Sequence, residues 1–209
     1  MVYRHEREAA EDMRTKREQI LDAAYVIFSQ KGYHRATIDE IIDLAATGKG
    51  TVYNYFHNKE ELFYILVKER SDPFELAIQD VVESLQPPMQ KIQLLIRMYL
   101  QFYVTNADLW RVLMHEMRGF SGSSGLTEKQ RDKYRSAFHA TIALLEEVIR
   151  EGIEQQVIRP CNANQAAYGL FSVIMMMVFQ KFAGTTPESF EKSAIQIADI
   201  FFHGVAWRE

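Results

Sequence analysis

Apolar residues recur at intervals of three and four along most of this chain, which is the spacing of the buried face of an amphipathic α-helix. The alternation of apolar and polar residues that indicates strands does not persist. We therefore predict an all-α protein with about nine helices. The expected stops include Gly32 after the first helix, the pair Pro87 and Pro88, and Gly184 with Pro187 before the last helix.

Residues 37–59, TIDEIIDLAATGKGTVYNYFHNK, hold the pattern that is most informative about function. Thr37 and Glu40 have the spacing of a capping box, which predicts the start of a helix running to about residue 46. Glycines crowd the turn that follows, and Val52 and Phe56 then place one face of a second short helix inward. Two short helices joined in this way form a helix-turn-helix, whose second helix can lie in the major groove of DNA.

The second of these helices carries side chains suited to DNA. Residues 47–59 include Lys49, His57 and Lys59 and no acid. The other exposed side chains are hydroxyls, an amide and aromatic rings, which can reach phosphates, base edges or the thymine methyl group. A helix-turn-helix also occurs as plain scaffold, so the pattern alone leaves a DNA-binding and a structural interpretation open.

The stretch TIDEIIDLAA, followed by GTVYNYFHNKEEL, resembles the DNA-binding signature of the TetR family, the tetracycline-repressor-like bacterial regulators. The resemblance is dense over residues 20–66 and only architectural elsewhere. The matching residues are Thr37, Gly50, Thr51, Tyr53, Tyr55, Phe56, Lys59, Glu60 and Leu62. The turn departs from the family pattern, since Ala45, Ala46, Thr47 and Gly48 stand where Ala-Gly-Val-Ser is usual. Glycine replaces the usual serine, so we expect a weaker helix cap.

The resemblance implies a role for each position in the reading helix. It assigns phosphate contacts to Thr37, Tyr55 and Lys59. It assigns base edges or groove walls to Lys49, Thr51, Tyr53 and Asn54, and close approach of the backbone to DNA at Gly50. It also implies a helix-turn-helix domain at 1–58, with a charged extension at 1–16, and a ligand-binding and dimerisation domain at 59–209.

Residues 168–179 are apolar on every side, and a helix of that kind must be buried all round. In a chain of this size one side can face the body, while the other side needs a second subunit. We therefore expect the last two helices to form a four-helix bundle in a homodimer, as the resemblance also implies. The expected interface residues are Ile174, Met177, Val178, Ile195, Ile197, Phe201 and Phe202. A monomer with a buried central helix is the alternative.

A two-fold dimer has a consequence for function. Two recognition helices about 34–36 Å apart would read a palindromic operator in double-stranded DNA. The resemblance favours a repressor that a small molecule releases, and this regulator needs a site for its effector. The helix from 59 to 71 begins beside the recognition helix and is expected to carry the signal, while Asp72 and Pro73 predict a break or kink after it.

Aromatic and methionine side chains of the middle helices could line an apolar cavity for a small hydrophobic or aromatic effector. The candidates are Tyr99, Phe102, Tyr103, Trp110, Met114, Met117, Phe138, Ile142, Phe171, Met175 and Phe179. Ordinary core packing is the alternative for each of them.

The net charge of −4 fits DNA binding only if the basic surface is local. Residues 1–70 hold 11 Lys and Arg against 12 Asp and Glu, so we expect the acids to turn away from the recognition helix. Cys161 is the only cysteine, which rules out an internal disulfide and suits a reducing cytoplasm. The N-terminus lacks a signal peptide's apolar core, and the longest apolar stretch, 166–179, is shorter than the ~20 residues of a membrane helix.

The sequence shows no clear motif for a catalytic site. The six histidines lack the spacing of a metal site, and the serines of the loop expected at 119–125 lack a strand-turn-helix elbow. We expect no metal, no cofactor and no enzymatic activity. Two other classes remain open: a helical ligand-binding or adaptor protein whose helix-turn-helix is only scaffold, and a hydrolase that uses an acid in a pocket.

Overall fold

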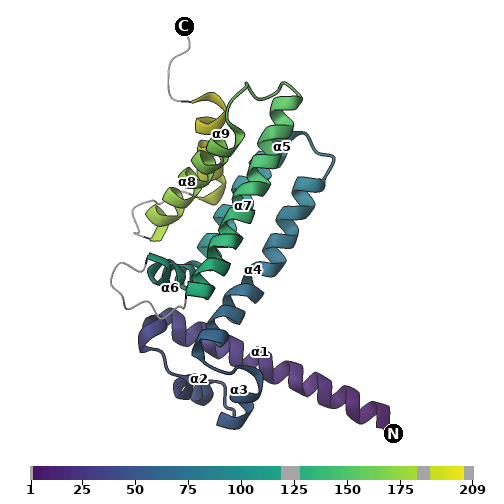
Figure 1. Cartoon of the computed structure of the whole chain (residues 1–209), viewed down its shortest axis with the longest axis vertical. Helices are drawn as coiled ribbons and strands as arrows, with labels where there is room; N and C mark the ends of the chain where they lie inside the picture. The colour runs from purple at the N-terminus through teal and green to yellow at the C-terminus, as the bar shows by residue number, and fades with distance from the viewer. Residues whose placement is uncertain (1, 119–127, 183–188, 205–209) are drawn as a thin grey trace. The chain divides into compact units, whose positions relative to one another are not determined.

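The computed structural model describes residues 2–118, 128–182 and 189–204, and the elements of regular secondary structure in those ranges are all helices (Figure 1). Its helices are α1 (Val2–Arg35), α2 (Ile38–Leu44), α3 (Lys49–Tyr55), α4 (Lys59–Glu83), α5 (Pro88–Thr105), α6 (Ala107–Arg118), α7 (Glu128–Glu154), α8 (Ala163–Phe182) and α9 (Phe190–His203). The prediction of an all-α fold is confirmed. The loop expected at 119–125 lies outside the described residues.

The chain forms two compact units. Unit 1 comprises Met1–Ser71 and Asp108–Arg131, and unit 2 comprises Asp72–Ala107 and Asp132–Glu209. These units do not coincide with the domains predicted from the sequence, because the division falls within α4 and α6 joins the N-terminal helices. The reason is visible in the side chains of α6, which contact the end of α1 and are described below.

Unit 1 is built on a small core shared by α1 to α4. Phe28 and Phe63 are fully buried and meet edge to face, with ring centroids 5.0 Å apart. Tyr33 stacks on Phe28 and meets Phe63 edge to face at 5.2 Å, as expected for a ring that closes this core. Gly32 has a φ of 74°, so the chain leaves the regular helix at the stop predicted from the sequence.

Of the break or kink predicted at Asp72 and Pro73, the break is wrong, because α4 continues as one helix through Pro73, while the kink stays a prediction. A proline inside a helix removes one backbone hydrogen bond and crowds the preceding turn. Here the flanking turns are anchored by apolar side chains that are buried on both sides of the proline, Leu66, Val67 and Ile78. This packing overrides the local preference for an interruption.

Unit 2 is organised around α5, which packs against α8 and α9. The buried face of α5 has the spacing of three and four read from the sequence: Ile92, Leu95, Ile96, Tyr99, Leu100 and Tyr103. A buried cation ties its first turns to two neighbours. The Lys91 ammonium donates to the carbonyl of Val82 at 2.8 Å and to Glu151 Oε2 at 2.9 Å, which satisfies the charge away from water.

Candidate nucleic-acid interface and ligand groove

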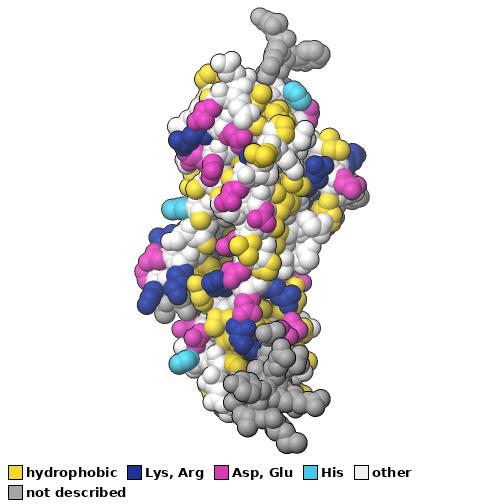
Figure 2. All heavy atoms as spheres, turned by 90° about the vertical axis from the view of Figure 1, so that its right-hand side faces the viewer, with side chains coloured by type: hydrophobic (Ala, Val, Ile, Leu, Met, Phe, Trp, Pro, Cys, Tyr) yellow, Lys and Arg dark blue, Asp and Glu magenta, His cyan; other side chains and the backbone are white. Residues whose placement is uncertain are grey.

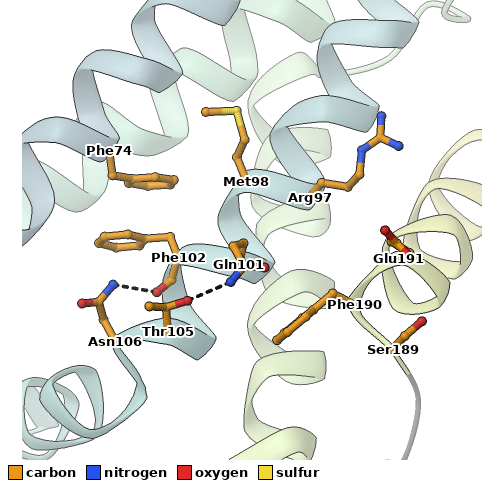
Figure 3. A pocket seen from close by; sticks show the side chains of 10 residues that line it. All are labelled: Phe74, Arg97, Met98, Gln101, Phe102, Thr105, Asn106, Ser189, Phe190 and Glu191. Atoms are coloured by element: carbon orange, nitrogen blue, oxygen red, sulfur yellow. Dashed lines mark hydrogen bonds between the residues drawn. The ribbon is translucent and has the colours of Figure 1, made fainter.

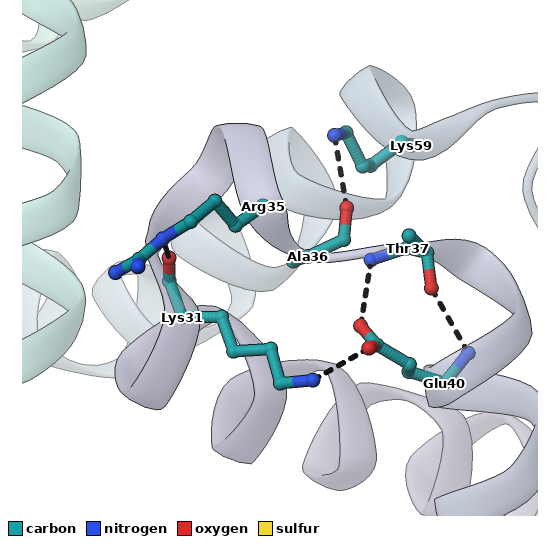
Figure 4. A network of polar contacts seen from close by, with 6 residues as sticks. All are labelled: Lys31, Arg35, Ala36, Thr37, Glu40 and Lys59. Carbon is teal, nitrogen blue, oxygen red and sulfur yellow. Dashed lines mark hydrogen bonds and ion pairs between the residues drawn. The ribbon is translucent and has the colours of Figure 1, made fainter.

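The start of α2 is fixed by the capping box predicted from the sequence (Figure 4). Thr37 Oγ1 accepts the Glu40 backbone N–H at 3.3 Å, and Glu40 Oε2 accepts the Thr37 backbone N–H at 3.1 Å. Lys31 Nζ lies 2.5 Å from Glu40 Oε1. The hydrogen bond from Lys31 is the main cause that holds the pKa of Glu40 below its usual value, and the hydrogen bond from the Thr37 backbone is the second. The entry into α2 is therefore tied back to α1.

Lys59 fixes the same loop from the other side. Its ammonium donates to the backbone carbonyls of Tyr33, His34 and Ala36 at 3.0, 3.3 and 3.0 Å, and it lies 4.7 Å from the centre of the Tyr33 ring. Desolvation by partial burial lowers the pKa of Lys59. An ammonium has three donors, and all three are used here. The phosphate contact of Lys59 stays a prediction, and in the free chain the ammonium holds the end of α1 and the entry into α2.

The recognition helix α3 begins at Lys49, and its N-cap residue, Gly48, provides no side-chain hydrogen bond. This agrees with the weaker cap expected from the departure in the turn. Val52 and Phe56 are buried as predicted. Tyr53, with 44% of its surface exposed, and the exposed Asn54 lie on the outer side.

The other residues of α3 that are predicted to contact DNA differ in exposure. Thr51 and Tyr55 are half-buried, whereas Lys49 and Gly50 are exposed. A Cβ atom built on Gly50 would meet nothing within 4 Å. The fold of the chain therefore does not itself demand glycine there, and the helix backbone stays open to an approaching partner.

The charges beside α3 differ from expectation. Lys49 Nζ lies 3.1 Å from Asp39 Oδ1, and His57 Nδ1 lies 2.9 Å from Glu61 Oε2. The hydrogen bond and the charge of Asp39 raise the pKa of Lys49. The prediction that acids turn away from the recognition helix is therefore wrong for Asp39 and Glu61. Figure 2 likewise shows acidic and basic side chains interspersed over one face of the molecule.

A buried carboxylate joins α6 to the end of α1 within unit 1. Glu116 is 2% exposed, and its oxygens lie 3.2 Å from His34 Nε2 and 3.3 Å from His115 Nδ1. Arg111 of α6 reaches the carbonyl of Ser29 in α1 at 3.5 Å. Sequence reasoning missed this cluster, because residues so far apart in the chain give no spacing signal.

Several residues of the predicted ligand cavity meet in unit 2, where they fill space with aromatic rings. Phe171 meets Tyr99, Tyr103 and Phe138 edge to face, with ring centroids 5.9, 6.1 and 5.4 Å apart. Burial raises the pKa of Tyr99 and Tyr103, because the phenolate form would lose its hydration. For the buried Tyr99, Tyr103 and Phe171 this is the ordinary core packing that was the alternative interpretation, whereas Phe138 is 38% exposed.

The other residues predicted for the cavity do not join that cluster as one set. Ile142 is buried in α7, and Met175 and Phe179 are half-buried on α8. Trp110 and Met114 belong to α6 in unit 1, and the side chain of Met117 lies outside the described residues.

Unit 2 has a groove of about 780 Å³ along the outer side of α5 (Figure 3). Phe74 of α4 and Phe102 of α5 stack at 3.9 Å on one side, and Phe190 of α9 lies on the other. The lining residues are Phe74, Arg97, Met98, Gln101, Phe102, Thr105, Asn106, Ser189, Phe190 and Glu191. Only Phe102 was among the predicted residues. The groove is large enough for a small molecule and combines apolar rings with an arginine.

Part of the subunit interface predicted on α8 and α9 is wrong, because several of its residues are buried within the single chain. Ile174, Val178 and Ile197 are 0% exposed, because the chain itself covers them. They cannot form a surface for a second subunit. Met177, Phe201 and Phe202 are half-buried, whereas Ile195 is 67% exposed. The exposed apolar side chains on these two helices are Tyr168, Met176, Ile195 and Ile200.

The described part of the chain also bears on membrane insertion and metal binding. In those ranges no helix is both long and apolar enough to span a membrane. No group of three or more His, Cys, Asp or Glu residues there could hold a metal ion.

Two family models match the chain. The model for bacterial regulatory proteins of the tetR family matches residues 20–64, and the model for the tetracyclin repressor-like C-terminal domain matches residues 85–205. The fatty acid metabolism regulator protein of Bacillus subtilis is 27% identical over 146 residues, which are 70% of this chain and 72% of that protein.

Solved structures share the fold. FadR from Bacillus subtilis, in complex with stearoyl-CoA, superposes with a TM-score of 0.77 at 23% identity, over 90% of this chain and 99% of that one. The fatty acid degradation regulator FadR from Bacillus halodurans gives 0.78 at 23% identity, over 92% and 97%. The relatives are transcriptional regulators and not enzymes. With its helix-turn-helix followed by a matching helical C-terminal region, this chain belongs to the TetR family of transcriptional regulators.

Proposed function

We propose that this chain is a cytoplasmic repressor that binds a palindromic operator as a homodimer and is released by a small hydrophobic effector. The observation that carries the proposal is the construction of the helix-turn-helix. The capping box of Thr37 and the three hydrogen bonds of Lys59 fix the loop before α2, and α3 then exposes Tyr53 and Asn54. A scaffold helix pair has no need to fix its entry while exposing an aromatic ring.

The contacts with DNA follow from this arrangement. Thr37 and Tyr55 contact phosphates, and Lys49, Thr51, Tyr53 and Asn54 face base edges or groove walls, while Gly50 admits the DNA backbone. The Thr37 hydroxyl accepts a hydrogen bond inside the capping box and still has its own proton to donate to a phosphate oxygen. Neutral groups thus supply most of the reading surface.

The dimer forms through α8 and α9, on the face that the single chain leaves exposed. Met176 and Ile195 are 59% and 67% exposed, and Tyr168 and Ile200 are exposed on the same two helices. Covering these side chains removes apolar area from water, which favours association. Substitution of Ile195 by Glu should convert the dimer to monomer in analytical ultracentrifugation, whereas Leu76→Glu, on an exposed residue of α4, should not.

The effector is an amphipathic molecule with an acyl chain or an aromatic body. The α4–α5–α9 groove offers the rings of Phe74, Phe102 and Phe190 to the apolar part and the exposed Arg97 to an anionic end. Relatives named as fatty acid regulators, one of them solved with stearoyl-CoA, support an acyl-CoA as the first candidate. Binding to the groove favours a conformation of the helix α4, which also carries Lys59, in which DNA affinity is low.

The test begins with footprinting on DNA from upstream of the protein's own gene, titrated against salt. Wild type should protect a palindrome, and salt should weaken the binding. Tyr53→Ala should lower operator affinity about tenfold or more by removing a base or groove contact, while Leu76→Ala should leave it unchanged. If wild type protects no DNA at any salt concentration, the interpretation of the helix-turn-helix as scaffold replaces this proposal.

The effector is tested separately by release from that site. Stearoyl-CoA should dissociate the complex at concentrations where CoA alone does not. Arg97→Gln should raise the concentration needed, and Arg150→Gln, on an exposed arginine of α7, serves as the control for charge. Release that is equally efficient in both variants would place the effector elsewhere.

A further inference from the structure

Each of the three basic side chains singled out in residues 47–59 has a protein partner. Lys49 is paired with Asp39, His57 is paired with Glu61, and Lys59 donates to three backbone carbonyls. The recognition segment therefore presents no uncompensated charge from these residues. Sequence-independent binding to DNA depends on cations that neutralise phosphates, so this arrangement must affect selectivity.

Of these pairs, Asp39 and Lys49 have the position from which DNA binding is affected most directly. Asp39 lies in the first turn of α2, two residues after the Thr37 cap, and Lys49 is the first residue of α3. The pair joins the two helices of the helix-turn-helix at the ends that approach DNA. The side chains are 73% and 64% exposed, so the pair is hydrated, weak and readily exchanged for another partner.

We propose that Asp39 is a selectivity residue, which suppresses the binding of this protein to DNA of arbitrary sequence. The inference rests on the proposed DNA-binding function. On any duplex, Lys49 must leave the Asp39 carboxylate to reach a phosphate, and the released carboxylate then faces the phosphate backbone. The sequence-independent part of the affinity is reduced.

The base-reading part of the affinity is reduced less. Tyr53, Asn54 and Thr51 are neutral, and their hydrogen bonds and apolar contacts with bases do not depend on the charge of Asp39. A carboxylate at this position therefore lowers binding to all DNA but raises the ratio of operator to non-specific affinity. That ratio determines occupancy in a genome full of competing sites.

The experiment measures binding to a mixed-sequence duplex across a range of salt concentrations, so that no operator need be known. Asp39→Asn should bind this duplex about twofold to fivefold more tightly per subunit, the range expected for freeing one exposed charge pair. The slope of log affinity against log salt should steepen by about one per subunit, because one more phosphate is neutralised. Asp43→Asn, an exposed acid later in α2, makes the same change in net charge and should do neither.

A double-mutant cycle assigns the effect to the pair. In a Lys49→Gln background, Asp39→Asn should lose most of its effect on the salt slope, because no lysine remains to be freed. Selection from a randomised duplex pool should also yield weaker enrichment of the preferred site with Asp39→Asn than with wild type. Circular dichroism of each variant checks that the helices are retained.

Three outcomes would overturn the inference. Equal effects of Asp39→Asn and Asp43→Asn would show a response to net charge alone. Loss of affinity for the preferred site, with the mixed duplex unaffected, would mean that Asp39 reads a base, such as the amino group of cytosine. If wild type binds no duplex at all, the proposed function fails together with the inference, which distinguishes that result from the other two.

Discussion

The helix-turn-helix region of unit 1 and the helical body of unit 2 differ in what fixes their functional surfaces. The reading helix α3 is held by its buried residues Val52 and Phe56, while polar contacts, namely the Thr37 capping box and the hydrogen bonds from Lys59, fix the entry into α2. The body has a core of aromatic rings, and its groove lies where three helices meet. Polar contacts fix a surface residue by residue, whereas packed rings fix a shape. The two units should therefore respond differently to substitution.

Replacing Phe63 should cause the largest loss of stability, and the loss should fall on unit 1. Its side chain is 0% exposed between Phe28 and Tyr33, and Phe63→Ala leaves a cavity that costs about 3–5 kcal/mol. Urea unfolding followed by circular dichroism should show an early loss of part of the helix signal, and DNA binding should disappear with it. Leu76→Ala, at an exposed position, is the control. A single transition that includes all the helix signal would show that the units unfold together.

In unit 2 the corresponding loss of stability is expected from substitution of Lys91. Lys91→Met leaves the Val82 carbonyl and Glu151 Oε2 without this donor, and because Glu151 is 32% exposed the loss should cost about 2 kcal/mol. The loss should appear in the urea midpoint, with little change in DNA affinity at temperatures where the variant is folded. Lys129→Met, on the exposed side of α7, should change neither quantity. A variant with normal stability would mean that Lys91 gains nothing from its partners.

Within unit 1, substitution of Lys59 and of Lys49 should have opposite effects on stability and on DNA binding. Lys59→Ala removes three charge-assisted hydrogen bonds and should destabilise the protein by about 2 kcal/mol. The slope of DNA affinity against salt should stay as in wild type if the three hydrogen bonds keep Lys59 from neutralising a phosphate. Lys49→Ala should instead leave stability unchanged and lower operator affinity, because it removes the proposed contact of Lys49 with a base edge or groove wall. A shallower slope for Lys59→Ala would restore the phosphate contact that its family position implies.

The sequence predicted the helix-turn-helix well because its signals are local. A capping box, a glycine stop and two inward residues on α3 lie within a few positions of one another, so their spacing reports their geometry. Lys59 shows the limit of this approach. Its three acceptors are the carbonyls of Tyr33 and His34 at the end of α1 and of Ala36 just after it, and only the folded chain shows that its donors are occupied.

The ligand groove could not be predicted for the same reason. Phe74, Phe102 and Phe190 come from three helices, and nothing in their separate sequences relates them. The apolar residues proposed for a cavity were selected by type, and type does not distinguish a cavity wall from a packed core. The subunit face of α8 was overestimated likewise, because Ile174 and Val178 are covered by the same chain.

The smallest expected effect is at Thr37, where one hydroxyl has a structural and a proposed DNA-binding role. Thr37→Ala removes the acceptor for the Glu40 N–H and should cost about 1 kcal/mol of stability, whereas Thr37→Ser should retain it. Thr37→Asp separates the roles, because a carboxylate caps the helix but cannot donate to a phosphate and repels it. Near-normal stability with greatly weakened DNA binding in Thr37→Asp would assign both roles to the hydroxyl. Normal DNA binding in that variant would leave Thr37 as a helix cap alone, and the reading surface would then begin at α3.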